Sequence, residues 1–159
     1  MPEGPEVRLL VDQLNSILKN TIMEELNINS GRYSKKSPDN YNEFISLLLG
    51  WKLVKFVKSN AIVFANHDKL LGVGAGQMSR IDSVKIAIRK SKENDLNLNG
   101  SIMASDAFFP FPDSVELAAG NGIVGVIQPG GSIKDNDIIK IANDLNLIMV
   151  FTRERHFYH

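Results

Sequence analysis

The chain has 159 residues, a formal net charge of zero and no cysteine. A chain of this length forms one domain of ordinary size or parts of two smaller ones. The charge predicts no general attraction to nucleic acid or anionic membranes, and the lack of cysteine excludes disulfides, thiolate metal sites and cysteine nucleophiles. Because no apolar run could span a bilayer and the first residues do not resemble a signal peptide, we expect a cytoplasmic protein with no membrane partner and no metal.

The first fifty residues predict a helix, a strand and a second helix. Apolar residues recur at three- and four-residue spacing over residues 5–18, which is typical of an amphipathic helix. A strand with imperfect alternation is expected over 22–28, and a polar, turn-rich stretch follows it. Ser37-Pro38-Asp39 is typical of a helix start, and we expect that helix to end at Gly50, since glycine favours helix ends.

From Trp51 onward, strands and helices alternate. The predicted strands are 53–54, 56–57, 61–65, 70–73, 102–104, 123–127 and 147–151. One predicted helix has the apolar face Ile81, Val84, Ala87 and Ile88, and two more are expected near 115–119 and over 136–145. We interpret the basic face of the first helix, Lys85, Arg89, Lys90 and Lys92, as a solvated surface. This alternation predicts an α/β fold with a parallel sheet and right-handed crossovers.

An aromatic, proline-containing stretch, residues 105–113, follows one of the predicted strands. Proline fixes φ and removes a backbone donor, so the stretch is expected to be a stiff, irregular loop. A loop of this kind at a strand end can receive a flat ligand in an open α/β sheet. The alternative is that its rings fill a gap in the core, and these residues alone support that reading at least as well.

Two further stretches could bind a ligand. In Gln128-Pro129-Gly130-Gly131-Ser132, the glycines let the backbone approach a ligand and the helix that follows offers N–H groups to an anion, although an ordinary turn is a common alternative. Gly72-x-Gly74-x-Gly76 lacks the spacing of a dinucleotide fingerprint. The C-terminal residues 153–159 combine arginines, which suit phosphate, with rings, which suit a planar heterocycle, so we expect a docked tail.

Five motifs occur together in one order. They are Lys58-Ser59-Asn60-Ala61-Ile62-Val63, residues 72–80, residues 105–111, residues 128–133 and Arg155-His156-Phe157. Together they resemble the C-terminal end of the bifunctional AICAR transformylase / IMP cyclohydrolase family, over residues 51–159. The resemblance implies a three-layer, cytidine-deaminase-like α/β domain with parallel strands. It also implies a role in purine biosynthesis, by formyl transfer from 10-formyltetrahydrofolate to the 5-amino group of AICAR.

The resemblance assigns roles to individual residues. The matched positions are Asn60, Arg80, Phe108, Asp113, Arg155, Phe157 and His159. By the resemblance, the asparagine orients the amine nucleophile, the arginines and Phe108 contact the nucleotide across a homodimer interface, and the aspartate holds the folate. The last two side chains complete the pocket. The family's paired Lys-His has no equivalent here, and the cyclohydrolase domain is missing, so we expect a half-site that is inactive alone.

The opening Met1-Pro2-Glu3-Gly4-Pro5-Glu6-Val7 supports a different resemblance. With Met1 removed, the Pro2 amine can attack a sugar C1′ and Glu3 can shuttle protons, although a prolyl helix start is the simpler reading of these residues. The string resembles the N-terminus of the formamidopyrimidine-DNA glycosylase / endonuclease VIII family, with Pro2 as Schiff-base nucleophile and Glu3 as general acid/base. Residues 1–50 hold five Lys or Arg and seven Asp or Glu, a poor electrostatic match for DNA.

The expected organisation is therefore an incomplete glycosylase-like segment, residues 1–50, joined to an incomplete transformylase-like domain, residues 51–159. The seam is expected between Gly50 and Lys58. The main hypothesis is a transformylase fragment that binds folate and an AICAR- or IMP-type nucleotide. One alternative is a base-excision-repair glycosylase/lyase remnant that binds DNA and acts through Pro2. The other is a non-catalytic α/β interaction module.

Overall fold

A computed structural model describes residues 36, 38 and 41–159. Pro2, Glu3, the helix expected over 5–18 and the strand expected over 22–28 lie outside these residues. The strands are β1 (Ile62–Ala65), β2 (Leu70–Gly74), β3 (Ile102–Ser105), β4 (Gly125–Gln128) and β5 (Ile148–Phe151). The helices are α2 (Tyr41–Val54), α3 (Arg80–Glu93), α4 (Asp113–Ala119) and α5 (Asp135–Asp144). Among the described residues, no helix is long and apolar enough to cross a membrane.

The strands form one mixed sheet with the order β2-β1-β3-β4-β5. Strands β3, β4 and β5 are parallel, as predicted, whereas β1 is antiparallel to both of its neighbours. A parallel pairing of β1 with β2 would need a crossover of a dozen or more residues. Here a short turn joins them, in which the Asn66 side chain accepts hydrogen bonds from the backbone of Asp68 and Lys69, both at 2.9 Å. The prediction of a wholly parallel sheet was therefore wrong for this half.

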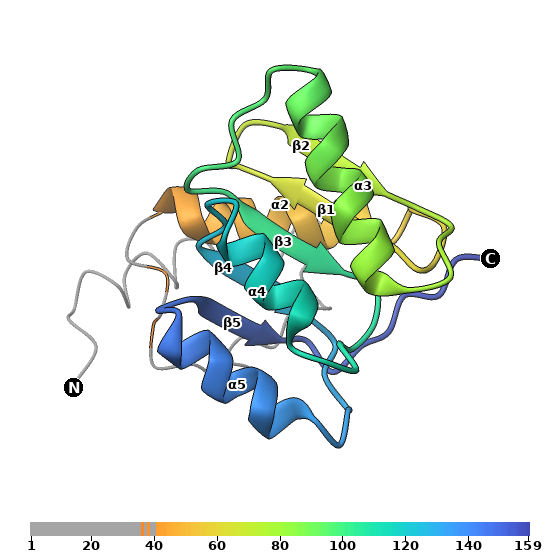
Figure 1. Cartoon of the computed structure of the whole chain (residues 1–159), viewed down its shortest axis with the longest axis vertical. Helices are drawn as coiled ribbons and strands as arrows, with labels where there is room; N and C mark the ends of the chain where they lie inside the picture. Colours follow the sequence, from red (N-terminus) through yellow and green to blue (C-terminus); the bar gives the residue numbers. More distant parts are fainter. Residues whose placement is uncertain (1–35, 37, 39–40) are drawn as a thin grey trace, which may run out of the picture.

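Helices cover both faces of the sheet, so the fold has three layers (Figure 1). Helix α2 lies on one face, and α3, α4 and α5 lie on the other. Along β1, Ile62 and Phe64 join the core on the three-helix side, while Val63 and Ala65 join the core under α2. Burial of both faces explains why the strands are continuous apolar runs rather than alternating ones.

Helix α2 is longer than the sequence predicts. We expected it to end at Gly50 and expected strands at 53–54 and 56–57, but the helix continues to Val54 and a turn follows it. Gly50 is needed for close packing, because a Cβ added there would lie 2.5 Å from Ile102 Cδ1. The domain boundary expected after residue 50 therefore falls within a helix that packs on the sheet.

Close packing also explains the Gly72-x-Gly74 motif. A Cβ on Gly74 would lie 1.9 Å from the Ser83 carbonyl oxygen, and one on Gly72 would lie 2.6 Å from that of Ala87. Helix α3 thus lies directly on the backbone of β2. The two glycines serve the packing of helix on strand rather than the approach of a ligand.

Strand register brings the ligand-candidate loops to one edge of the sheet. Because β1 runs against its neighbours, its first residue, Ile62, pairs with the last residue of β2, Gly74, and with the last residue of β3, Ser105. On the other side, the ends of β4 and β5 pair as Gln128 with Phe151. The segments 58–61, 75–79, 106–112, 129–134 and 152–159 therefore all leave the same edge, which we call the loop edge. The last segment, the tail, runs along this edge from β5 toward α3 (Figure 1).

Candidate functional site

A buried carboxylate, Asp106, lies at the centre of the loop edge. Directly after β3 and fully buried, it accepts hydrogen bonds at Oδ1 from Arg80 Nη2 at 2.9 Å and from the Ala61 N–H at 3.1 Å. Its Oδ2 accepts from the Ser59 hydroxyl. The Arg80 side chain is only 10% exposed, and its Nε donates to Ser105 Oγ at 3.0 Å. Because a buried charge needs an opposite charge and full hydrogen bonding, these contacts fix the start of α3.

Sequence reasoning quoted Asp106 inside a motif but gave it no role. The available signal was its place directly after a strand predicted to be buried, where an ionised side chain needs a partner. Arg80 was expected to contact a nucleotide, yet two of its nitrogens already bind this chain. Its partner could not be identified from sequence, since 26 positions separate the two residues.

Asn60 lies half-buried in the loop before β1. Its side-chain Nδ2 donates to the Gln77 carbonyl at 2.8 Å, and its backbone carbonyl accepts from Ser83 Oγ at 2.7 Å. Within the described part of the chain, its Oδ1 has no donor. The amide is thus held from both sides by the start of α3 and the loop before it, and it keeps an acceptor available for an N–H group.

The tail is docked, as the sequence predicts. Backbone N–H groups of Thr152, Arg153 and His156 donate to the carbonyls of Gln128, Pro129 and Asp106, at 2.8, 3.0 and 3.0 Å. The Ser59 N–H donates to the Tyr158 carbonyl at 2.9 Å. The ring of His156 lies 4.4 Å from that of Trp51 in α2. The tail is thereby joined to every layer of the fold near the loop edge.

Docking of the tail places Arg155 between two rings. Its guanidinium carbon lies 5.0 Å from the Phe108 ring centre and 4.7 Å from that of Phe157, which stacks in turn on His159 at 5.6 Å. Arg155, Phe157 and His159 are exposed and Phe108 is half-buried. A cation held between aromatic faces at an open surface can receive both a phosphate and a flat ring.

Both readings of the aromatic loop hold, each for different rings. Phe109 is fully buried in the core, and its N–H donates to Gln128 Oε1 at 3.3 Å. Phe108 turns instead toward Arg155, and Phe111 is 60% exposed. Asp113 begins α4, is exposed, and accepts from the Ser114 N–H at 2.7 Å. Among the described residues, no hydrogen bond or ring contact joins Asp113 to the Arg155 group.

The glycine turn before α5 does not offer free donors to an anion, as we had expected. The N–H groups of Gly131 and Ser132 donate to the carboxylate of Asp135, at 2.7 and 3.1 Å. Asp135, the first residue of α5, thus occupies the position predicted for a ligand anion. Its negative charge suits a helix N-terminus, which explains why the chain supplies its own anion here.

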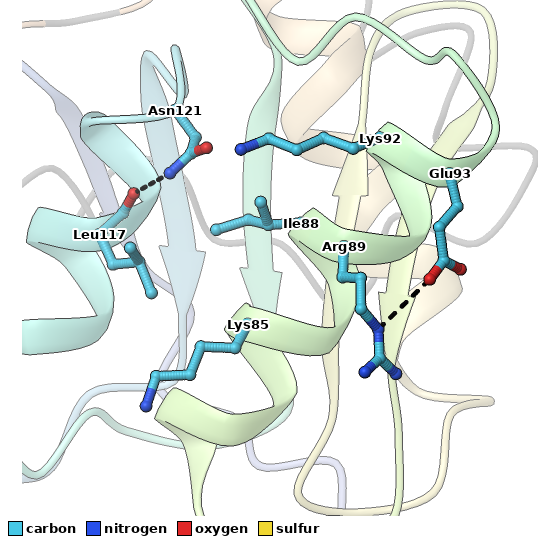
Figure 2. A pocket seen from close by; sticks show the side chains of 7 residues that line it. All are labelled: Lys85, Ile88, Arg89, Lys92, Glu93, Leu117 and Asn121. Carbon is cyan, nitrogen blue, oxygen red and sulfur yellow. Dashed lines mark hydrogen bonds and ion pairs between the residues drawn. The ribbon is translucent and has the colours of Figure 1, made fainter.

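A groove of about 350 Å³ lies away from the predicted residues, between α3 and α4 (Figure 2). Figure 2 shows Ile88 and Leu117 facing each other across it, with Lys85 and Lys92 extending from α3 toward α4. Its cations are exposed, which confirms the solvated basic face predicted for this helix. Within residues 36, 38 and 41–159, no group of three or more His, Asp or Glu could hold a metal ion.

Comparisons with known proteins agree on one family. The family model described as AICARFT/IMPCHase bienzyme matches residues 8–90. The chain belongs to this family. Among the family's members, the bifunctional purine biosynthesis protein PurH of Xanthomonas campestris pv. campestris is 52% identical over 126 residues, which are 79% of this chain and 24% of that protein. PurH of Chlorobium luteolum is 48% identical over 151 residues, 95% of this chain and 28% of that protein.

The chain spans about a quarter of the length of these AICARFT/IMPCHase relatives. The family match covers both sides of the seam expected between Gly50 and Lys58, so it includes residues 8–50, which we had assigned to a glycosylase-like segment. Among solved structures, the dCMP deaminase of cyanophage S-TIM5 aligns with a TM-score of 0.46 and 14% identity, over 65% of this chain and 92% of that one.

Proposed function

We propose that this chain supplies part of the nucleotide and folate site of an AICAR formyltransferase in cytoplasmic purine biosynthesis. In this reaction the formyl group of 10-formyltetrahydrofolate passes to the 5-amino group of AICAR. The observation that carries the proposal is the convergence of Asn60, Phe108 and Arg155 on one edge of the sheet, in a chain of the AICARFT/IMPCHase family.

The chemistry of these side chains suits the two substrates. The Arg155 guanidinium can pair with the phosphate of AICAR, while Phe108 and Phe157 offer flat faces to a heterocycle. Asn60 Oδ1 can accept an N–H of the 5-amino group and so direct its lone pair toward the formyl carbon. Asp113 is exposed at the start of α4, where it can bind an N–H of the folate.

Two parts of the reaction need groups beyond this chain. No Lys-His dipeptide occurs in its sequence, so a pair of that kind for the proton transfers would have to come from elsewhere. We propose that the site is completed in a homodimer. Large apolar side chains on the loop-edge segments support this, since Met78 is 97% exposed, Ile133 101% and Phe111 60%. The chain alone is then a binding half-site with feeble turnover.

We expect the chain to bind AICAR, and expect Arg155→Ala to weaken that binding by about 10- to 100-fold, because a charge-assisted pair with phosphate is lost. Isothermal titration calorimetry measures both affinities. Arg89→Ala is the matched control, since Arg89 pairs with Glu93 on the outer face of α3 and should leave the affinity unchanged. No heat with millimolar AICAR would remove the proposal; if the chain were nevertheless a stable dimer, the interaction-module alternative would be favoured.

For the glycosylase alternative, we expect no covalent adduct when the chain is treated with borohydride and abasic-site DNA. The family match over residues 8–90 and the net charge of residues 1–50 both favour the purine assignment. Pro2 and Glu3 lie outside the described residues, so gel analysis of this trapping reaction is the direct test. An adduct in the parent chain that disappears in Pro2→Gly would establish the second activity.

A further inference from the structure

We propose that Asp106 is a positioning residue that holds three segments of the site as one unit: the loop before β1, the start of α3 and the tail. Each segment carries a residue of the proposed site, namely Asn60, Arg80 and Arg155. For its ligand the inference rests on the proposed function, whereas its geometry stands independently of that function.

The contacts form a closed ring around Asp106. Its backbone carbonyl accepts from the His156 N–H at 3.0 Å, two residues along the tail the Tyr158 carbonyl accepts from the Ser59 N–H at 2.9 Å, and the Ser59 hydroxyl returns to Asp106 Oδ2. Only one member of this ring, the Asp106 carboxylate, also carries the ion pair with Arg80. A change at this one side chain is therefore felt in all three segments.

The ring sets the position of the groups that face outward. Asn60 follows Ser59 directly, and Arg155 precedes His156 directly, so fixing the ring fixes both. Phe108, which contacts Arg155, lies only two residues after Asp106. Arg80 has two nitrogens bound to Ser105 and Asp106 and is 10% exposed. We therefore assign to Arg80 an indirect role, as the countercharge that keeps Asp106 in place.

The first test is amide hydrogen exchange in Asp106→Asn, which preserves size but removes the charge. We expect exchange at the His156 and Ser59 amides to become about 10-fold faster or more, while amides inside β4 change much less. Asp135→Asn is the matched control, because Asp135 also binds backbone N–H groups but has no contact with the tail. Unchanged exchange at both amides, or the same acceleration throughout the chain, would overturn the proposal.

The second test is AICAR affinity by calorimetry. We expect at least about 10-fold weaker binding in Asp106→Asn and less than about 2-fold change in Asp135→Asn. The double variant Arg80→Gln with Asp106→Asn replaces the ion pair by a neutral amide pair, and should bind more tightly than either single variant. A double variant no better than the singles would overturn the indirect role of Arg80.

Two further outcomes are separable. If Asp106→Asn does not fold, Ser59→Ala removes one bond of the ring without changing its charge, and we expect about 3-fold faster exchange at His156. No change there would overturn the ring. If the parent chain binds no AICAR, the proposed function falls, but the exchange measurements still decide whether Asp106 joins the three segments.

Discussion

Gly74→Ala should lower the free energy of unfolding by about 3 kcal/mol or more, the upper end of the usual cost of overpacking. The added Cβ would lie 1.9 Å from the Ser83 carbonyl oxygen and 2.6 Å from Ser83 Cα, so backbone rather than a flexible side chain must move. Helix α3 would have to withdraw from β2. Ser83 Oγ holds the Asn60 carbonyl at 2.7 Å, and Arg80 begins the same helix, so the loop edge should be disturbed as well.

Urea denaturation followed by circular dichroism measures this loss. Gly120→Ala is the matched control, because Gly120 has the helical φ of −62° and an added Cβ would lie 3.5 Å from the Glu116 carbonyl oxygen, an ordinary contact. We expect its stability to change by no more than about 1 kcal/mol, toward greater stability. Equal effects of the two substitutions would show that the contact of α3 with β2 is not tight.

We expect Trp51→Ala to lower the free energy of unfolding by about 3–5 kcal/mol, the usual cost of deleting a buried aromatic side chain. Trp51 is 2% exposed, packs in the core between α2 and the sheet, and contacts the His156 ring at 4.4 Å. The substitution should therefore also loosen the tail. Urea denaturation followed by circular dichroism again gives the change, since Trp51 is the chain's one tryptophan and its fluorescence is lost.

Trp51→Phe separates packing from hydrogen bonding. Among the described residues, Trp51 Nε1 is buried without a hydrogen-bond partner. Replacement by phenylalanine therefore sacrifices no bond, and we expect a smaller loss of about 1–2 kcal/mol from the reduced volume. A phenylalanine variant as unstable as the alanine variant would contradict this account and would indicate an essential role for the indole N–H.

Much of the fold follows from local pattern. The apolar periodicity of α3 and the short apolar runs of β1 and β3 to β5 correctly predict those elements, because each must present its apolar surface to the core. The docked tail was predicted from the arginines and rings that follow β5. The end of α2 was wrong, because Gly50 was interpreted by its helix-ending tendency, whereas its missing side chain serves contact with Ile102.

The sequence by itself determined the alternation of strands and helices, the family, and the motifs that carry the proposed site. Only the tertiary structure decided that β1 runs antiparallel, that Asp135 fills the anion position before α5, and that Asp106 pairs with Arg80 and holds the tail. The reason is physical. Periodicity and turn chemistry act between near neighbours and are written in the chain, whereas a buried charge acquires its partner only when segments distant in sequence are packed together.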